Sequence, residues 1–133
     1  MSDVIPATHL DLLESVAMAH IATIGPSGEP QNSPVWFGWD GEFIRFTQLT
    51  TLRQKARNLE REPRVAISIT DPGDPYRYLE VRGRVERIEA DPAGAYIDVM
   101  AKKYMGVNIY PHRNDGDEFV VVVIRPERTT QMG

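Results

Sequence analysis

Six short segments with strand-like residue patterns most tightly restrict what this chain can fold into. They are apolar or alternate apolar with polar residues, and turn-forming Pro, Gly and Asp separate them. The segments are Ala19–Ile24, Pro30–Trp39, Glu42–Gln48, Val65–Thr70, Tyr76–Glu89 and Phe119–Ile124. The pattern predicts a mainly β (α+β) chain with about six antiparallel strands in a small barrel, rather than a doubly wound sheet.

Individual Gly and Pro residues add detail to this prediction. The turn at 25–28 and the hairpin signal Asp40-Gly41 predict that the first three strands pair consecutively. Pro34 cannot donate to a sheet, so its strand lies at an edge, carries a bulge, or meets another group there. Gly83, inside the longest strand, predicts a bulge or a close approach of backbone.

Short helices are expected between some of these strands. Ala7–Val16 has apolar residues on one face and is expected to cover one end of the barrel. A second helix follows Thr50 or Thr51 and ends before Pro63, and a third starts at Asp91-Pro92 and runs to about Tyr104. The residues after 124 are expected to form a tail.

The second of these helices lies in an unusually basic stretch. Thr51–Arg64 contains five basic and two acidic residues, a net charge of +3, while the whole chain has −4 and the remainder therefore −7. A helix N-terminus with free N–H groups and cations favours an anion. The stretch is therefore either an anion-binding site or a solvated helix face with ordinary surface Arg and Lys.

Composition excludes several classes of protein. The 133 residues, 41% of them hydrophobic, predict a single domain over residues 1–133 with a real core. The absence of Cys excludes disulfides and thiolate chemistry and fits a cytoplasmic location. The sequence has no apolar run long enough to span a membrane and no secretory signal. A pI near 5.3 argues against nucleic acid, which leaves a small molecule or another protein as partner.

Motifs of common enzyme sites are missing. His9, His20 and His112 lack metal-ligand spacing, so no metal site is expected. The Asn114–Glu118 run does not match a calcium loop and is expected to be solvated. There is no GxSxG, P-loop or GxGxxG motif, and no side chain identifies itself as a catalytic acid.

Aromatic residues cluster in two places. Trp36 should point to the face opposite Phe37 and Trp39, because strand side chains alternate. Core packing explains one of these faces, and a dimer interface or the wall of a planar-ligand site would explain the other. Tyr76 and Tyr78 share a face and allow the same interpretation, or they are ordinary edge residues.

Three stretches resemble the pyridoxamine 5′-phosphate oxidase-like split-barrel superfamily: His20–Gln48, Arg53–Ile69 and Tyr78–Glu89. The most characteristic motif is K-A-R-N-L-x-x-x-P-R-V at Lys55–Val65. Within the superfamily the chain is most similar to reductases that depend on the deazaflavin coenzyme F420, from about His9 to Arg128. The resemblance implies a split-barrel homodimer with two cofactor sites at the subunit interface.

The resemblance also implies which residues bind the cofactor. Residues of the second strand would line the ring, the end of the third strand would meet the ring edge and ribityl chain, basic residues would bind the phosphate, and tyrosines would come from the partner subunit. In this order they are Asn32, Ser33, Pro34 and Val35; Thr47, Gln48, Thr50 and Thr51; Arg53, Lys55 and Arg57; Tyr76 and Tyr78. His112 or Arg113 of the partner subunit would lie near the cofactor tail. Cations that could contact the polyglutamate tail of F420, or equally be solvated, are Arg57, Arg61, Lys102 and Lys103.

The implied activity is hydride transfer from reduced F420 to a small conjugated acceptor such as an enone, a quinone or a tetrapyrrole-like compound. An FMN-binding oxidoreductase of the same fold and a non-catalytic F420- or flavin-binding protein are the alternatives. True pyridoxamine phosphate oxidases have an Arg-x-His motif near the C-terminus. This chain ends in IRPERTTQMG, so pyridoxal phosphate synthesis is not expected.

Overall fold

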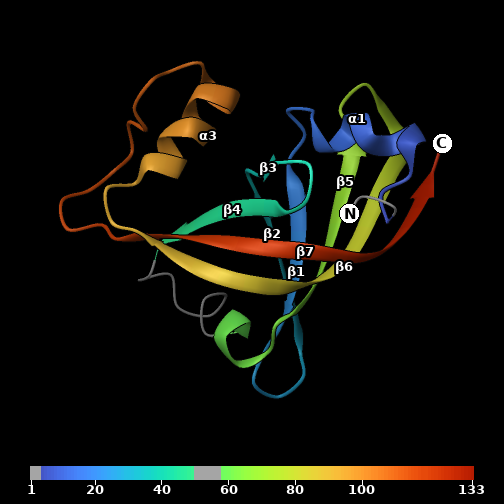
Figure 1. Ribbon diagram of the computed structural model, residues 1–133, viewed down its shortest axis with the longest axis horizontal. Helices are drawn as coiled ribbons and strands as arrows, with labels where there is room; N and C mark the ends of the chain where they lie inside the picture. Colours follow the sequence, from blue (N-terminus) through green and yellow to red (C-terminus); the bar gives the residue numbers. More distant parts are fainter. Residues whose placement is uncertain (1–3, 50–57) are drawn as a thin grey trace.

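The described strands form one curved antiparallel sheet. The computed structural model describes residues 4–49 and 58–133. The sheet order is β2-β1-β5-β6-β7-β4-β3. The strands are β1 (Ala19–Ile24), β2 (Pro30–Val35), β3 (Gly38–Trp39), β4 (Ile44–Leu49), β5 (Arg64–Asp71), β6 (Asp74–Asp91) and β7 (Phe119–Met132). The predicted mainly β architecture with short helices is confirmed (Figure 1).

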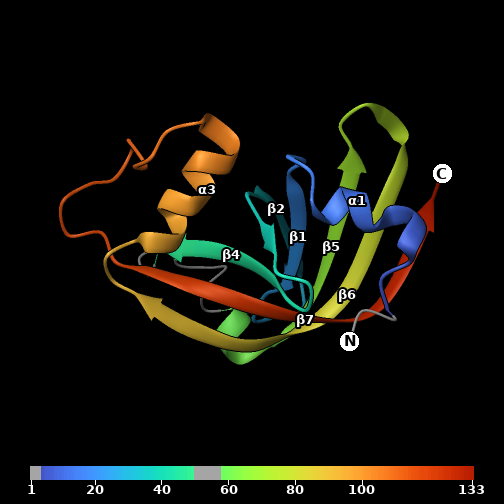
Figure 2. The same ribbon diagram turned by 45° about the horizontal axis from the view of Figure 1, so that its top comes forward.

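The sheet curls because its two edge strands are neighbours in the sequence. β2 and β3 lie at opposite edges, yet only Trp36 and Phe37 separate them. A connection this short spans about 3.5 Å per residue, so the edges must approach each other, and the curvature is visible in Figure 2. We call Trp36-Phe37 the crossover.

This arrangement corrects two predictions. Pro30–Trp39 is not one strand, and the first three strands do not pair consecutively: β2 pairs with β1, whereas β3 pairs with β4. Pro34 lies opposite His20 on β2, an edge strand, which is the part of a sheet that accommodates Pro. The edge position of Pro34 is one of the predicted alternatives.

Gly83 lies where the backbone of β6 closely approaches that of β7. The register between these strands shifts at Arg82/Gly83, so the predicted bulge is present. A Cβ atom at position 83 would collide with the carbonyl oxygen of Arg125. Both the bulge and the close backbone approach are therefore confirmed.

We expect Gly83→Ala to lower the free energy of unfolding by about 1–3 kcal/mol, because backbone must move to admit the methyl group. Gly73→Ala is the matched control: the nearest atom to its Cβ would be Asp71 Oδ1 at 3.5 Å. The control should stay within about 0.5 kcal/mol of the parent chain. Urea denaturation of both variants measures the difference, and equal losses would contradict a steric role for Gly83.

The helices differ from the predicted ones at their ends. Instead of Ala7–Val16 there are a 3₁₀ turn, η1 (Ala7–His9), and a single-turn helix, α1 (Leu10–Leu13). Ser15 stops α1, because its hydroxyl donates to the Leu12 carbonyl (2.8 Å) and accepts from the Ala17 N–H (3.1 Å). Residues 58–61 are also helical.

The third predicted helix is α3 (Ala95–Met105), which starts three residues later than Pro92. Asp91 still serves its start, because its carboxylate accepts from the N–H groups of Ala95 (3.1 Å) and Tyr96 (2.9 Å). Gly106, with φ of 76°, ends the helix as predicted.

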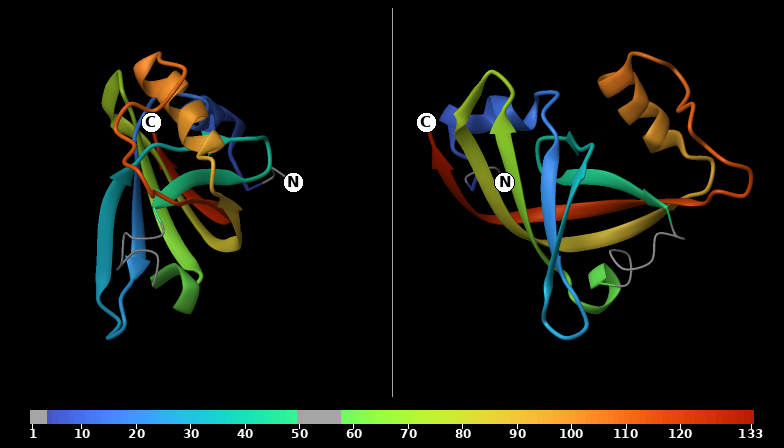
Figure 3. Two further views of the ribbon diagram at one scale, coloured as in Figure 1. Left: turned by 90° about the vertical axis from the view of Figure 1, so that its left-hand side faces the viewer. Right: turned by 180° about the vertical axis from the view of Figure 1, so that it is seen from behind.

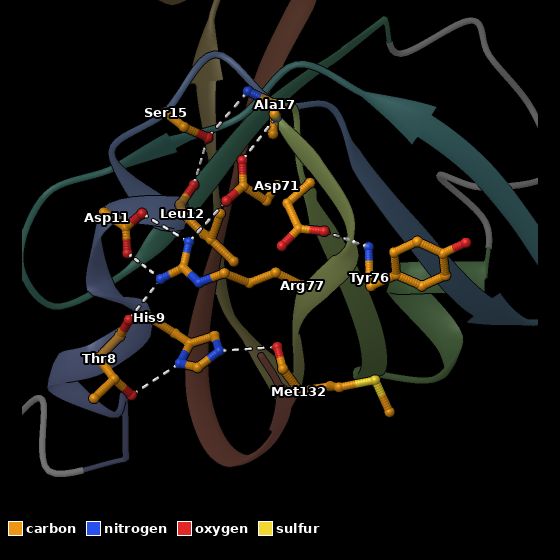
Figure 4. A network of polar contacts seen from close by, with 12 residues as sticks. Thr8, His9, Asp11, Leu12, Ser15, Ala17, Asp71, Tyr76, Arg77 and Met132 are labelled. Atoms are coloured by element: carbon orange, nitrogen blue, oxygen red, sulfur yellow. Dashed lines mark hydrogen bonds and ion pairs between the residues drawn. The ribbon is translucent and has the colours of Figure 1, made fainter.

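The predicted C-terminal tail is wrong, because β7 continues to Met132 along β6. Its last residues are polar and mostly exposed, so they lack the apolar signal that marks the first half of the strand. They also hold the N-terminal segment: the Thr129 hydroxyl donates to the Val4 carbonyl (2.7 Å), and His9 Nε2 donates to the Met132 carbonyl (3.1 Å). Figure 4 shows the second contact.

Arg77 fastens α1 to the hairpin between β5 and β6. Its guanidinium donates to Asp11 (2.7 Å), to Asp71 (3.0 Å) and to the Thr8 carbonyl (2.6 Å), as Figure 4 shows in part. Leu12 and Leu13 of α1 are buried in the main hydrophobic core. The helix therefore covers one end of the barrel, as predicted.

Acid should destabilise the fold, because hydrogen bonds lower the pKa of several carboxyl groups. Arg64 lowers the pKa of Glu62 to about 2, and Arg77 lowers the pKa of Asp11. A carboxyl whose pKa is lower in the folded chain stabilises it above the unfolded-state pKa and loses this effect as the pH falls. The free energy of unfolding should therefore decrease from about pH 5 towards pH 2.

Arg77→Gln provides the test of this pH dependence. The variant should be less stable than the parent chain at pH 7, and the gap between the two curves should narrow as the pH falls from about 5 towards 2 and Asp11 and Asp71 become protonated. Thermal unfolding across that range measures the gap. A gap of constant size at every pH would assign the effect of Arg77 to packing instead of charge.

Candidate functional site

A pocket of about 350 Å³ lies between the barrel and the segment that follows α3. We call residues 107–118, between α3 and β7, the connector. The barrel supplies Pro34, Val35, Trp36, Thr47, Gln48 and Leu49; the connector supplies Tyr110, His112, Asn114 and Asp117; Met18, Ile97 and Phe119 complete the lining. The volume is at the lower end of the range for small-molecule sites.

The crossover places its two aromatic side chains on opposite faces, as predicted. Phe37 is fully buried in the main core, where Trp39 also packs. Trp36 packs in the second hydrophobic cluster, beneath α3 and the connector. One dipeptide thus joins the sheet edges and supplies a wall of the pocket.

Trp36 is held rigidly among other rings. It stacks on Tyr104, with ring centroids 5.1 Å apart and planes 4° apart, and meets the ring of Tyr110 edge-on at 6.0 Å. The Tyr104 hydroxyl donates to the Ala17 carbonyl (2.7 Å), which fixes that ring in turn. The ring of His112 lies edge-on to Tyr110 at 5.6 Å. These contacts give the pocket a flat, preformed aromatic wall.

Lys103 contacts the crossover through both the backbone and the ring of Phe37. Its Nζ donates to the Phe37 carbonyl (2.6 Å) and lies 4.5 Å from the centroid of the Phe37 ring and 4.9 Å from that of Tyr104. Burial lowers the pKa of Lys103. Its position differs from both sequence-based alternatives, a contact to a cofactor tail and a solvated charge, because α3 turns this side chain inward. Lys102 instead donates to Asn108 (3.2 Å).

The structure brings together four of the predicted cofactor residues. Pro34 and Val35 line the pocket from β2, and Thr47 and Gln48 line it from β4. Two of these have donors already engaged: the Thr47 hydroxyl donates to the Val120 carbonyl and Gln48 Nε2 to the Leu49 carbonyl, each at 3.3 Å. Residues of the second and third predicted strands therefore converge on one cavity.

Other predicted residues lie elsewhere in the described chain. Asn32 and Ser33 are on β2 but do not line the pocket. Tyr76 is 79% exposed and Tyr78 half-buried, on the hairpin near α1, as Figure 4 shows for Tyr76. Arg113 is bonded to Asp98 at 2.8 Å, in contrast to the predicted alternative of a contact to the cofactor tail, whereas His112 faces the pocket of its own chain.

The predicted phosphate site lies outside the described residues. This applies to Thr50, Thr51, Arg53, Lys55 and Arg57. Their roles remain predictions, but the described residues on either side of this segment have defined contacts. Leu49 lines the pocket, and Asn58 is anchored on the barrel.

Asn58 is a structural residue that sequence reasoning missed as such. It is fully buried, and its Nδ2 donates to Thr23 Oγ1 (3.0 Å) and Gln31 Oε1 (3.1 Å). Arg61 adds a hydrogen bond to the Ile24 carbonyl, so it is engaged by the barrel. The short helix therefore lies beside the β1–β2 hairpin (Figure 3). A polar Asn beside apolar Leu59 in the K-A-R-N-L motif was the signal for this role.

The pocket itself has little charge. Among its described lining residues there is no Lys or Arg, and Asp117 is the one carboxylate. A second hollow of about 310 Å³, on the outer face of β1, β5 and β6, contains Arg64, Arg82 and Arg84. Each of these arginines pairs with a carboxylate, at 2.8, 3.0 and 3.4 Å, so none of the described residues that line the second hollow is an uncompensated cation.

The described part of the chain adds two further findings. No helix within residues 4–49 and 58–133 has the length and apolar character needed to cross a membrane. Over the same residues, no three His, Cys, Asp or Glu side chains come together as a metal site.

A curled antiparallel sheet closed by the crossover, with a pocket beside it, defines a split-barrel protein. The chain belongs to the pyridoxamine 5′-phosphate oxidase family, whose model matches residues 5–133. The resemblance inferred from the sequence is thereby confirmed. No match was found among curated proteins.

Solved structures agree with this assignment. A structure described as an F420 reductase is 44% identical, covers 95% of this chain and 98% of its own, and superposes with a TM-score of 0.87. A conserved hypothetical protein from Mycobacterium tuberculosis is 24% identical over 99% of this chain and 88% of its own, with a TM-score of 0.74. A putative pyridoxamine 5′-phosphate oxidase from Listeria innocua is 20% identical over 93% and 94%, with a TM-score of 0.71. The last two share the fold.

Proposed function

We propose that this protein is an oxidoreductase that uses reduced coenzyme F420 to transfer a hydride to a small conjugated acceptor. The observation that carries the proposal is an aromatic, nearly uncharged pocket whose lining residue Leu49 is followed in the sequence by a strongly basic stretch. The pocket ends at Leu49, and the basic residues Arg53, Lys55 and Arg57 follow within the next eight positions. The similarity to an F420 reductase supports the choice of cofactor.

The described residues fit a planar ring system with an anionic tail. Trp36, Val35 and Leu49 offer apolar surface, and Trp36 is already fixed by Tyr104. A deazaflavin ring needs such a surface, while its phosphate needs cations that the described pocket lining does not supply. Arg53 and Lys55 would supply them, with Arg57 as a further contact.

When bound, reduced F420 supplies the hydride, and the chain itself positions the rings and excludes water. Pro34 and Val35 would flank the ring, and Thr47 and Gln48, whose donors already bond backbone, would shape its edge.

We also propose a homodimer in which Tyr76 and Tyr78 reach the partner's cofactor. The large exposed fraction of Tyr76, 79%, supports this contact, since an exposed tyrosine at a hairpin end is suited to an interface.

Side-by-side titration of the apo-protein with F420 and FMN, followed by fluorescence or calorimetry, tests the cofactor. We expect micromolar or tighter binding of F420 and weaker binding of FMN. Preference for FMN would make the protein a flavin oxidoreductase. Binding of F420 without turnover of menadione or cyclohexenone would make it a carrier of the cofactor, and binding of neither cofactor would overturn the proposal.

A further inference from the structure

One carboxylate oxygen of Asp98 accepts hydrogen bonds from two residues of the connector. Asp98 Oδ1, on α3, accepts from the backbone N–H of Tyr110 (2.9 Å) and from Arg113 Nη2 (2.8 Å). These two contacts fix the chain on both sides of His112. The connector is thus tied to α3 at the residues that line the pocket.

Arg113 completes this attachment. Besides Asp98, its guanidinium donates to the carbonyls of Ala93 (2.6 Å) and Gly94 (3.3 Å), and it lies 5.4 Å from the centroid of the Phe119 ring. Gly94 has φ of 69°, and a Cβ there would come within 2.8 Å of the guanidinium, so the turn before α3 is shaped to admit this side chain. We call Asp98 and Arg113 the latch.

The latch is more than an ordinary surface ion pair. An exposed pair contributes little, but the side chains of Asp98 and Arg113 are only 28% and 30% exposed and together make three hydrogen bonds to the backbone of two segments, the connector and the turn before α3. Arg113 Nε is buried and has no hydrogen-bond partner among the described residues. The free-energy cost of burying this unpaired N–H is tolerated where the other contacts of the side chain define its position.

The latch positions the residues with which the connector lines the pocket. Tyr110 and His112 line it opposite the barrel residues, and Tyr110 also contacts Trp36. The barrel side carries the described residues proposed for the cofactor, Pro34, Val35, Thr47 and Gln48. The connector's side of the pocket is therefore left to contact the acceptor, the molecule that receives the hydride.

We infer that Asp98 and Arg113 are positioning residues that determine acceptor selectivity by holding Tyr110 and His112 at the pocket. This inference rests on the proposed function. The latch is expected to affect the KM for the acceptor and the discrimination between acceptors, and to leave cofactor affinity nearly unchanged.

The test compares Asp98→Asn, Arg113→Gln and the double variant with the parent protein and with Arg125→Gln. Arg125 forms an exposed ion pair with Glu86 (3.0 Å) and does not line the pocket, so it is a matched control. Three quantities are measured: the Kd for F420 by fluorescence, kcat and KM for menadione and for cyclohexenone, and the near-UV circular dichroism of Trp36. A Trp39→Phe background isolates that last signal, because the chain has two tryptophans.

We expect each latch variant to keep its F420 Kd within about twofold and to raise the KM for an acceptor by about tenfold, as for loss of a charge-assisted hydrogen bond. The ratio of kcat/KM between the two acceptors should change, the Trp36 signal should decrease, and the double variant should be no worse than either single one. The control should match the parent protein in every measurement.

Two results would overturn the inference alone: an unchanged acceptor ratio in variants that bind F420 normally, or an additive loss in the double variant. Equal loss of cofactor affinity and acceptor turnover would make the latch a purely structural feature. A parent protein that binds no F420, or binds it without turnover, would instead overturn the proposed function, and the inference with it.

Discussion

Reversing the charge of both Arg53 and Lys55 to Glu is expected to weaken F420 binding by roughly a thousandfold or more. Each cation is predicted to make a charge-assisted contact to the phosphate, and reversal adds repulsion to the loss of that contact. Fluorescence titration of the double variant measures the effect. The fold should persist, because Arg and Lys side chains are almost never fully buried in a core.

The control for this variant must match its change in net charge. Arg125→Glu with Arg128→Glu changes the charge by the same amount on β7, away from the pocket lining. It should bind F420 with nearly parental affinity at physiological salt. Equal weakening in both double variants would mean that long-range charge, rather than a local site, attracts the cofactor. Unchanged affinity in the Arg53, Lys55 variant would place the phosphate elsewhere.

Phe37→Ala is expected to lower the free energy of unfolding by about 3–5 kcal/mol, which is a large part of the stability of a chain this size. The Phe37 ring is fully buried in the main core and supports the Lys103 ammonium group at 4.5 Å. Its removal leaves a cavity at the crossover and removes one of the two rings that Lys103 contacts. Chemical denaturation measures the loss.

Trp36→Ala gives the contrasting result from the adjacent position. Trp36 is half-buried and lines the pocket, so its loss should cost less stability than that of Phe37 but should weaken F420 binding more strongly. Measuring both quantities for both variants separates the roles of the two faces. A Trp36 variant that binds F420 like the parent protein would remove this side chain from the proposed site.

The sequence predicted the strands better than their arrangement. Alternation in segments such as Ala19–Ile24 and the Gly83 anomaly reflect local geometry, so both were predictable. The splitting of Pro30–Trp39 was not, because the path from one sheet edge to the other depends on contacts with α3 that are remote in sequence. The end of β7 was missed because a strand with polar, exposed residues lacks an apolar pattern.

In the candidate site, too, some features were predictable from the sequence and others depended on contacts between remote residues. Proximity of Pro34 and Val35 to Thr47 and Gln48 followed from family resemblance and is present in the pocket lining. The connector's contribution was missed, because its polar residues predict an irregular loop and nothing local indicates the side that it faces. The attachment of Arg113 to Asp98, fifteen residues away, likewise needs the three-dimensional structure.

The crossover makes this chain intolerant of insertions and deletions at one point. Adjacent strand-like residues face opposite ways, so one residue added or removed between Val35 and Gly38 would exchange the faces of the two aromatic rings. The barrel would then lose its buried Phe, and the pocket would lose its Trp in the same event. Loops such as the β1–β2 turn can change length without this double effect, so length variation should be tolerated there and excluded at the crossover.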